Sequence, residues 1–198
     1  MILQDIINII ESVAPLSYQE SWDNSGLQVG DRNAEVHAAL LTIDVTESVV
    51  DEAINKRCDL IISHHPLLFH GLKHLTGETP QERCVEKAIR HNIAIYSSHT
   101  AMDAYIHGVS GKIADKLGIN HYQILCPTTE QNIGLGVIGT LNNPMNSDDF
   151  IRFVQDVFDC SLRYIEPPAK LITTVAICGG AGAEFIEHAI AQKADFFI

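Results

Sequence analysis

The chain has 198 residues, 46% apolar and 19% charged, which is the composition of a soluble globular protein with one domain or two small lobes. Its formal net charge of −12 predicts no nucleic-acid partner and no anionic membrane partner, because both require a basic surface. A small anionic substrate remains compatible, since a bound metal ion reverses the local field. The apolar runs are shorter than the roughly 20 residues of a membrane helix.

The first half of the chain predicts helices and strands in alternation. Spaced isoleucines predict an amphipathic helix over 2–14 rather than a secretory signal, and a turn-rich loop follows over 21–35. Alternating strands and helices indicate a parallel, doubly wound α/β sheet. The expected strands are 37–45, 59–63 and 93–98, and the expected helices are 47–57, 80–91 and 109–118.

The second half repeats the alternation after a looser stretch at 126–132. The final residues, ADFFI, have the composition of a strand that is just beginning. We therefore expect the natural C-terminus to lie beyond residue 198. The expected elements are strand 133–141, a helix opening at Ser147, a weaker strand near 162–165, strand 171–180 and helix 183–193.

Histidines and acids follow three of the expected strands. His64 and His65 end one strand, the segment from His99 to Asp103 follows another, and Asp44 follows a third. Functional groups of parallel sheets collect beyond the carboxyl ends of the strands. Histidines with a carboxylate form a ligand set for a divalent transition ion. A bend at Pro66 would bring both neighbouring imidazoles to one place, where each can hold one of two ions.

Purely structural roles remain open for each of these motifs. A histidine beside a strand is commonly a hydrogen-bonded structural residue. The exposed turn around Asp23 and Asn24 either lines a site or is a capped loop anchored by Trp22. The glycine-rich segment 178–185 matches no nucleotide-binding motif, so it indicates either close helix–strand packing or an oxyanion at a helix N-terminus.

Five segments together resemble a known family. The chain is similar to the Ngg-interacting-factor-three-like dinuclear metal-centre proteins, the GTP cyclohydrolase 1 type 2 homologues. The resemblance covers nearly the whole chain, and the double histidine followed by HTxxD is its most specific part. The segments are WDNSGLQVG (22–30), DVT (44–46), ISHHPLLFHG (62–71), SSHTAMD (97–103) and VAICGGAG (175–182).

The resemblance implies an α/β fold of two similar lobes with mostly parallel sheets flanked by helices and no inserted domain. We expect the first lobe over 1–125 and the second, incomplete at its C-terminus, over 126–198. The resemblance implies that His64 and His65 each bind one of two divalent ions and that Asp103 shares an ion with His65. It places His99 beside the metal rather than on it, with Asp23, Asn24 and Asp44 as further candidates around the site.

The resemblance further implies a hexameric homo-oligomer. The five separated cysteines, with no CxxC pair, predict reduced thiols and a cytoplasmic location. Imidazole and carboxylate ligands suit Zn, Fe, Mn, Co or Ni and do not select among them. The leading hypothesis is a metal-dependent hydrolase acting on a nucleotide or phosphoester, with no catalytic residue assigned. The alternative is a non-enzymatic, metal-stabilised binding or scaffold protein.

Overall fold

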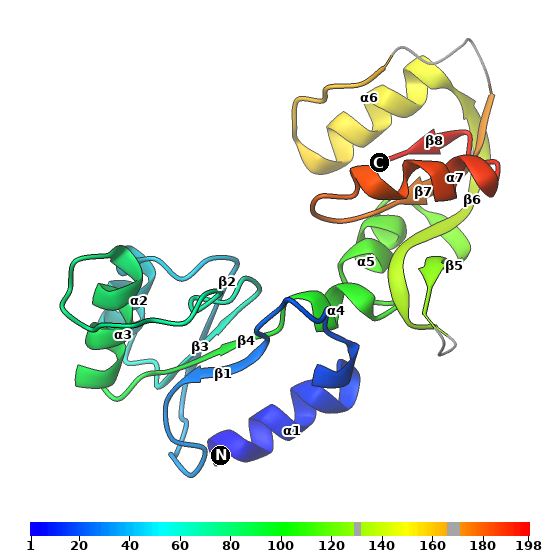
Figure 1. The fold of residues 1–198 in the computed structure, drawn as a ribbon. Helices are drawn as coiled ribbons and strands as arrows, with labels where there is room; N and C mark the ends of the chain where they lie inside the picture. The colour runs from blue at the N-terminus through cyan, green and yellow to red at the C-terminus, as the bar shows by residue number, and fades with distance from the viewer. Residues whose placement is uncertain (129–131, 166–170) are drawn as a thin grey trace. The chain divides into compact units, whose positions relative to one another are not determined.

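The computed structural model describes residues 1–128, 132–165 and 171–198 (Figure 1). The chain divides into two compact units, Met1–Met102 and Asp103–Ile198, and each contains a four-stranded sheet. The division falls earlier than the expected boundary after residue 125. Its physical reason is packing, because Ala114, Leu117 and Ile119 belong to the core of the second sheet.

The first sheet has the strand order β1-β4-β3-β2. Strands β2, β3 and β4 run parallel, as the alternation predicts, and β1 joins the edge of β4 antiparallel. Strand β1 was not expected, since it lies inside the segment whose Asp, Asn, Ser and Gly content predicted a loop. The bounds are Gly26–Val29 for β1, Ala39–Thr42 for β2, Leu60–Ser63 for β3 and Ala94–Ser97 for β4.

Helices cover both faces of this sheet, as Figure 1 shows. Side chains alternate along a strand, so Leu60 packs with helix α1 on one face and Ile61 packs with α2 and α3 on the other. The α2 helix opens where expected, because the Thr46 hydroxyl accepts the backbone N–H of Val49. The bounds are Leu3–Val13 (α1), Leu16–Tyr18 (η1), Glu47–Lys56 (α2), Pro80–Arg90 (α3) and Thr100–Ala104 (α4).

The second sheet has the order β5-β6-β7-β8. The expectation of mostly parallel sheets is wrong here, because β5, β6 and β7 pair antiparallel and only β7 with β8 is parallel. Only six residues lie between the end of β5 and the start of β6, too few for the helical crossover that parallel neighbours need. The bounds are Ile119–Pro127 (β5), Gly134–Asn146 (β6), Leu171–Ile177 (β7) and Phe196–Phe197 (β8).

Helices also flank the second sheet. Phe150 of α6 and Leu117, which caps α5, pack in one core cluster, and Ala189 of α7 packs in another. The expected weaker strand near 162–165 is wrong, since these residues form no strand and Ile165 is 93% exposed. The bounds are Val109–Lys116 (α5), Ser147–Phe158 (α6), Ala183–Phe185 (η2) and Ile186–Ala191 (α7).

The glycine-rich segment after β7 supports the packing interpretation. A Cβ added to Gly179 would lie 2.7 Å from Cγ1 of Val109, closer than real side chains approach. The Gly179 N–H also donates to the Ser110 hydroxyl at 3.2 Å. The glycine is therefore required by the close approach of the α5 N-terminus. Throughout the described ranges, no helix has the length and apolar character to cross a membrane.

Candidate metal centre

Three histidines follow the carboxyl ends of two neighbouring parallel strands, β3 and β4, of the first sheet. Ser63 at the end of β3 pairs with Ser97 at the end of β4, so the residues that follow the two strands emerge side by side. His64 and His65 follow β3 directly, and His99 follows β4 after one intervening serine. The pairing register therefore explains why histidines 34 or more residues apart in the sequence meet here.

The chain turns at the double histidine, so the side chains of His64 and His65 can lie close together although they are adjacent in the sequence. The N–H groups of His64 and His65 still donate to the carbonyl groups of Thr42 and Ile43, at 3.2 and 2.9 Å. The Ser63 hydroxyl then donates to the His65 carbonyl at 2.8 Å. This local bond closes a turn immediately after the strand, so the strict alternation of strand side chains ends at Ser63.

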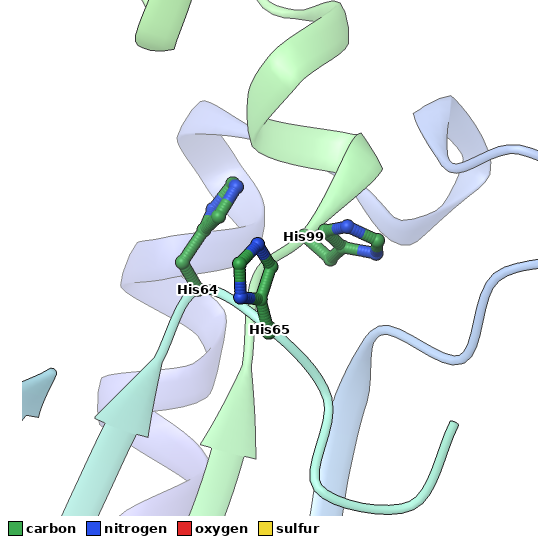
Figure 2. Close-up of side chains that lie close together, drawn as sticks. All are labelled: His64, His65 and His99. Carbon is green, nitrogen blue, oxygen red and sulfur yellow. The ribbon is translucent and has the colours of Figure 1, made fainter. Parts of the chain in front are cut away.

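The three imidazole rings form a compact cluster, which we call the histidine cluster (Figure 2). Ring centroids are separated by 4.9 Å for His64 and His65, 5.3 Å for His64 and His99, and 5.4 Å for His65 and His99. One nitrogen from each ring lies within 4.8 Å of the others. Two nitrogens bound to one tetrahedral ion are about 3.3 Å apart, so the rings would have to rotate toward each other to share one ion.

A carboxylate orients His65 within the histidine cluster. Oδ1 of Asp44 lies 2.8 Å from Nδ1 of His65, which favours the tautomer that carries its proton on Nδ1. Nε2 is then the nitrogen that faces a metal. Histidines that bind metals characteristically donate their other N–H to a carboxylate.

A second carboxylate orients His99 in the same way. Oδ1 of Asp23 lies 2.8 Å from Nδ1 of His99, and the Asp23 side chain is completely inaccessible to solvent. Oδ2 of Asp23 accepts the Thr100 hydroxyl at 2.5 Å and the Ser25 hydroxyl at 2.8 Å. Burial raises the pKa of this carboxyl, but the hydrogen bonds it accepts, led by that of Thr100, outweigh burial and lower the pKa to about 2. Asp23 is therefore ionised at neutral pH.

The donor chemistry of the histidine cluster fits a divalent transition metal. Imidazole nitrogen is the common protein ligand for Zn, Fe, Co and Ni. His65 and His99 each have a carboxylate on Nδ1, which fixes the ring and leaves Nε2 available to a cation.

The structure gives further contacts for the remaining expected residues. His99 groups with His64 and His65, and its expected place beside the metal stays a prediction. Asn24 ties two loops together, since its Nδ2 donates to the Leu68 carbonyl at 2.7 Å. Asp103 is the first residue of the second unit, and its role as a ligand stays a prediction.

Sequence reasoning missed two hydroxyl groups, those of Ser63 and Ser97, that bind the backbone of the histidine cluster. The Ser63 and Ser97 hydroxyls lie 2.8 Å apart, and both reach the His65 carbonyl. Each serine ends a strand immediately or shortly before a candidate histidine, which is the signal that identifies them. Of the two interpretations left open for the turn at Asp23 and Asn24, an anchor at Trp22 does not fit, since Trp22 is 57% exposed and the Asp23 side chain is the buried one.

Space for a substrate exists beside Asp44. A cavity of about 540 Å³ opens there. Its walls come from residues 44–48, from Leu67 and from the start of α3. The histidines do not line this cavity, and Asp44, which contacts His65, is the residue that connects it to the histidine cluster.

Comparison with known proteins gives consistent similarities. A protein of Clostridium acetobutylicum named GTP cyclohydrolase 1 type 2 homolog is 36% identical over 199 aligned residues, which cover 99% of this chain and 74% of that protein. A fission yeast protein, Schizosaccharomyces pombe Protein NIF3 homolog, is 33% identical, with 90% of this chain and 69% of that protein covered.

A solved structure has the same fold. Staphylococcus aureus protein SA1388 superposes with a TM-score of 0.92 at 29% identity, covering 100% of this chain and 78% of that one. The sequence profile of one family matches residues 1–198. The chain therefore belongs to the Duf34/NIF3 (NGG1p interacting factor 3) family.

Proposed function

We propose that the protein binds divalent transition-metal ions at the histidine cluster and acts as a metal-dependent hydrolase on a nucleotide or a phosphoester. The observation that carries the proposal is the pair of carboxylate–imidazole contacts, Asp44 with His65 and Asp23 with His99, each at 2.8 Å. Metal-binding histidines characteristically donate their other ring N–H to a carboxylate in this way.

The residues of the candidate site have two roles, metal binding and ring orientation. His64, His65 and His99 would hold the metal, and the family resemblance adds Asp103 as a further candidate ligand. Asp44 and Asp23 fix the tautomers and the ring orientations of two of the ligands. A bound divalent ion supplies Lewis acidity and lowers the pKa of water toward neutrality. The cavity beside Asp44 provides room for the substrate next to His65.

The nucleotide class is supported by names of relatives, several of which are called GTP cyclohydrolase 1 type 2 homolog. By the same resemblance we propose two ions for each subunit, drawn from Zn, Fe, Mn, Co or Ni, with His64 and His65 on different ions. We also propose a homo-oligomer of six subunits in the cytoplasm. Its formation is checked by the mass of the intact protein in solution.

The alternative function is that of a metal-stabilised binding or scaffold protein. The family description, NGG1p interacting factor 3, refers to an interaction rather than to a reaction. Of the groups around the histidine cluster, Asp23 and Asp44 are both engaged in orienting rings, which leaves neither assigned as a general acid or base. The two functions differ in whether water exchanges at the bound metal.

The experiment is turnover by the intact, metal-reconstituted protein. GTP and a panel of phosphodiesters are incubated with the protein and with His65→Ala, and products are separated by chromatography. The hydrolase proposal predicts product formation that His65→Ala reduces to background. His74→Ala is the matched control, because His74 is an exposed histidine of the loop that follows. Equal background rates for all three proteins, with metal bound, would favour the scaffold.

A further inference from the structure

Two large aromatic side chains beside the histidine cluster are left open to solvent. Trp22 is 57% exposed and Phe69 is 41% exposed. Their ring centroids are 5.9 Å apart, with 54° between the ring planes. Single exposed apolar residues are ordinary on protein surfaces, but this pair comes from two loops and meets at a candidate site. We call Trp22 and Phe69 the aromatic pair.

The aromatic pair adjoins the candidate metal ligands. The Trp22 and Phe69 centroids lie 6.1 and 6.4 Å from that of His99, and both rings present an edge-on arrangement to it. A molecule lying on the aromatic pair would therefore lie next to His99 of the histidine cluster.

Hydrogen bonds next to the aromatic pair hold it in place without burying it. Asn24, two residues after Trp22, donates to the Leu68 carbonyl at 2.7 Å, and the Leu68 N–H donates to Oε1 of Gln28 at 3.1 Å. Asp23, next to Trp22, fixes the Trp22 loop through its buried carboxylate. The two rings are thus presented on braced loops, which reduces the ordering cost of binding a ligand there.

We propose that the aromatic pair is the stacking surface for the planar heteroaromatic ring of the substrate, such as a purine base. This inference rests on the proposed function and specifies which part of the substrate the protein recognises first. A ring cannot insert between Trp22 and Phe69, because two van der Waals contacts need about 7 Å between parallel planes. The base therefore lies on the outer face of the pair, where stacking accepts any base because every base has a π-face.

Trp22 is the single tryptophan of the chain, so its fluorescence reports directly on this surface. Titration of the intact, metal-loaded protein with guanosine 5′-monophosphate should quench Trp22 emission in a saturable way. Ribose 5-phosphate, which has the sugar and phosphate without the base, should not quench it. Equal quenching by both compounds would overturn the proposal, as would Trp22 emission that acrylamide cannot reach.

Variants then separate the two rings from the metal site. Phe69→Leu keeps an apolar side chain without an aromatic face, and calorimetry should show guanosine monophosphate binding weakened roughly 5- to 100-fold. Trp22→Leu should weaken it similarly, and Trp22→Phe should retain most of the affinity. Tyr164→Leu is the matched control, since Tyr164 is a 55% exposed aromatic of the second unit, and it should bind like wild type.

Failure of this inference is distinguishable from failure of the proposed function. Guanosine monophosphate affinity of Phe69→Leu and Trp22→Leu equal to that of Tyr164→Leu would overturn the stacking surface, even if the protein hydrolyses its substrate. Base-dependent quenching without any turnover or metal binding would leave the stacking surface standing and reject the hydrolase. Metal content, measured on each variant by atomic absorption, should match wild type, because the aromatic pair offers no ligand atom.

Discussion

The Asp44 carboxylate lies 2.8 Å from Nδ1 of His65, although the two side chains are 65% and 48% exposed. An exposed polar contact of this kind contributes little to stability. Its geometry instead fixes the orientation of a ring that belongs to the histidine cluster. Asp23 makes the same contact with His99, but from a fully buried position. A substitution of Asp44 should therefore change metal binding alone, whereas a substitution of Asp23 should change both metal binding and stability.

Asp44→Asn should weaken metal binding without affecting the fold. The neutral amide orients the His65 ring less firmly, and loss of such a partner typically lowers metal affinity roughly 10- to 100-fold. The free energy of unfolding should stay within about 0.5 kcal/mol of wild type. Competition with a chromogenic chelator measures the affinity. Asp51→Asn, which removes an exposed carboxylate paired with Lys87, is the control and should bind metal normally.

Asp23→Asn should reduce both metal affinity and stability. One oxygen becomes an NH₂ group that faces the donors Ser25 and Thr100 or His99. A buried polar group without its partner costs about 1–3 kcal/mol, measurable as a lower urea midpoint of the metal-free protein. A metal-free variant as stable as wild type would contradict the role assigned to this carboxylate.

The paired serines beneath the histidine cluster should each contribute to stability. Ser63→Ala and Ser97→Ala remove hydroxyl groups that bind the His65 carbonyl and each other, and each should cost about 1 kcal/mol. The double variant should cost less than the sum, because the two hydroxyls share one network. Ser98→Ala is the control, since the buried Ser98 hydroxyl has no hydrogen-bond partner among the described residues, and it should be neutral or stabilising in thermal unfolding.

The sequence was sufficient to predict the three parallel strands of the first sheet and the meeting of its histidines, but not the antiparallel strand β1. Apolar runs that end in polar residues located β3 and β4, and parallel pairing places the ends of such strands together. What it could not supply was the ring geometry that brings His99 against His64 and His65. That geometry depends on Asp23, 76 residues away in the chain, and local sequence patterns carry no information on such a contact.

The second sheet was harder to predict, for reasons that specific residues explain. Strand β5 is interrupted by His121, which has a positive φ of 50°, next to a shift in register, so its sequence lacks a strand's regular alternation. Strand β6 contains Pro144 within a second irregular stretch. The expected strand near 162–165 failed because Tyr164 and Ile165 remain exposed, although β-branched and aromatic residues are typical of strands.

The Glu82 carboxylate should make stability depend on acid pH. Glu82 accepts the N–H and hydroxyl of Thr76 and the hydroxyl of Thr79, and these bonds, led by the Thr76 N–H, lower its pKa from 4.5 to about 2. A lowered folded-state pKa stabilises the protein above the unfolded value, and the benefit is lost as pH falls through 4.5 toward 2. Glu82→Gln should therefore be less stable than wild type at pH 6, with a difference that shrinks below pH 4.5 in urea unfolding. Glu78→Gln, an exposed neighbour, should show no such pH-dependent difference.

Metal content of the intact protein tests the account most directly. The protein is purified without chelators, and transition metals are quantified by mass spectrometry in wild type, His65→Ala, His99→Ala and the exposed control His74→Ala. The account predicts stoichiometric metal in wild type and His74→Ala, with most of it lost from His65→Ala and His99→Ala. Metal-free wild type that takes up none of the added ions, or equal metal content in all four proteins, would contradict it.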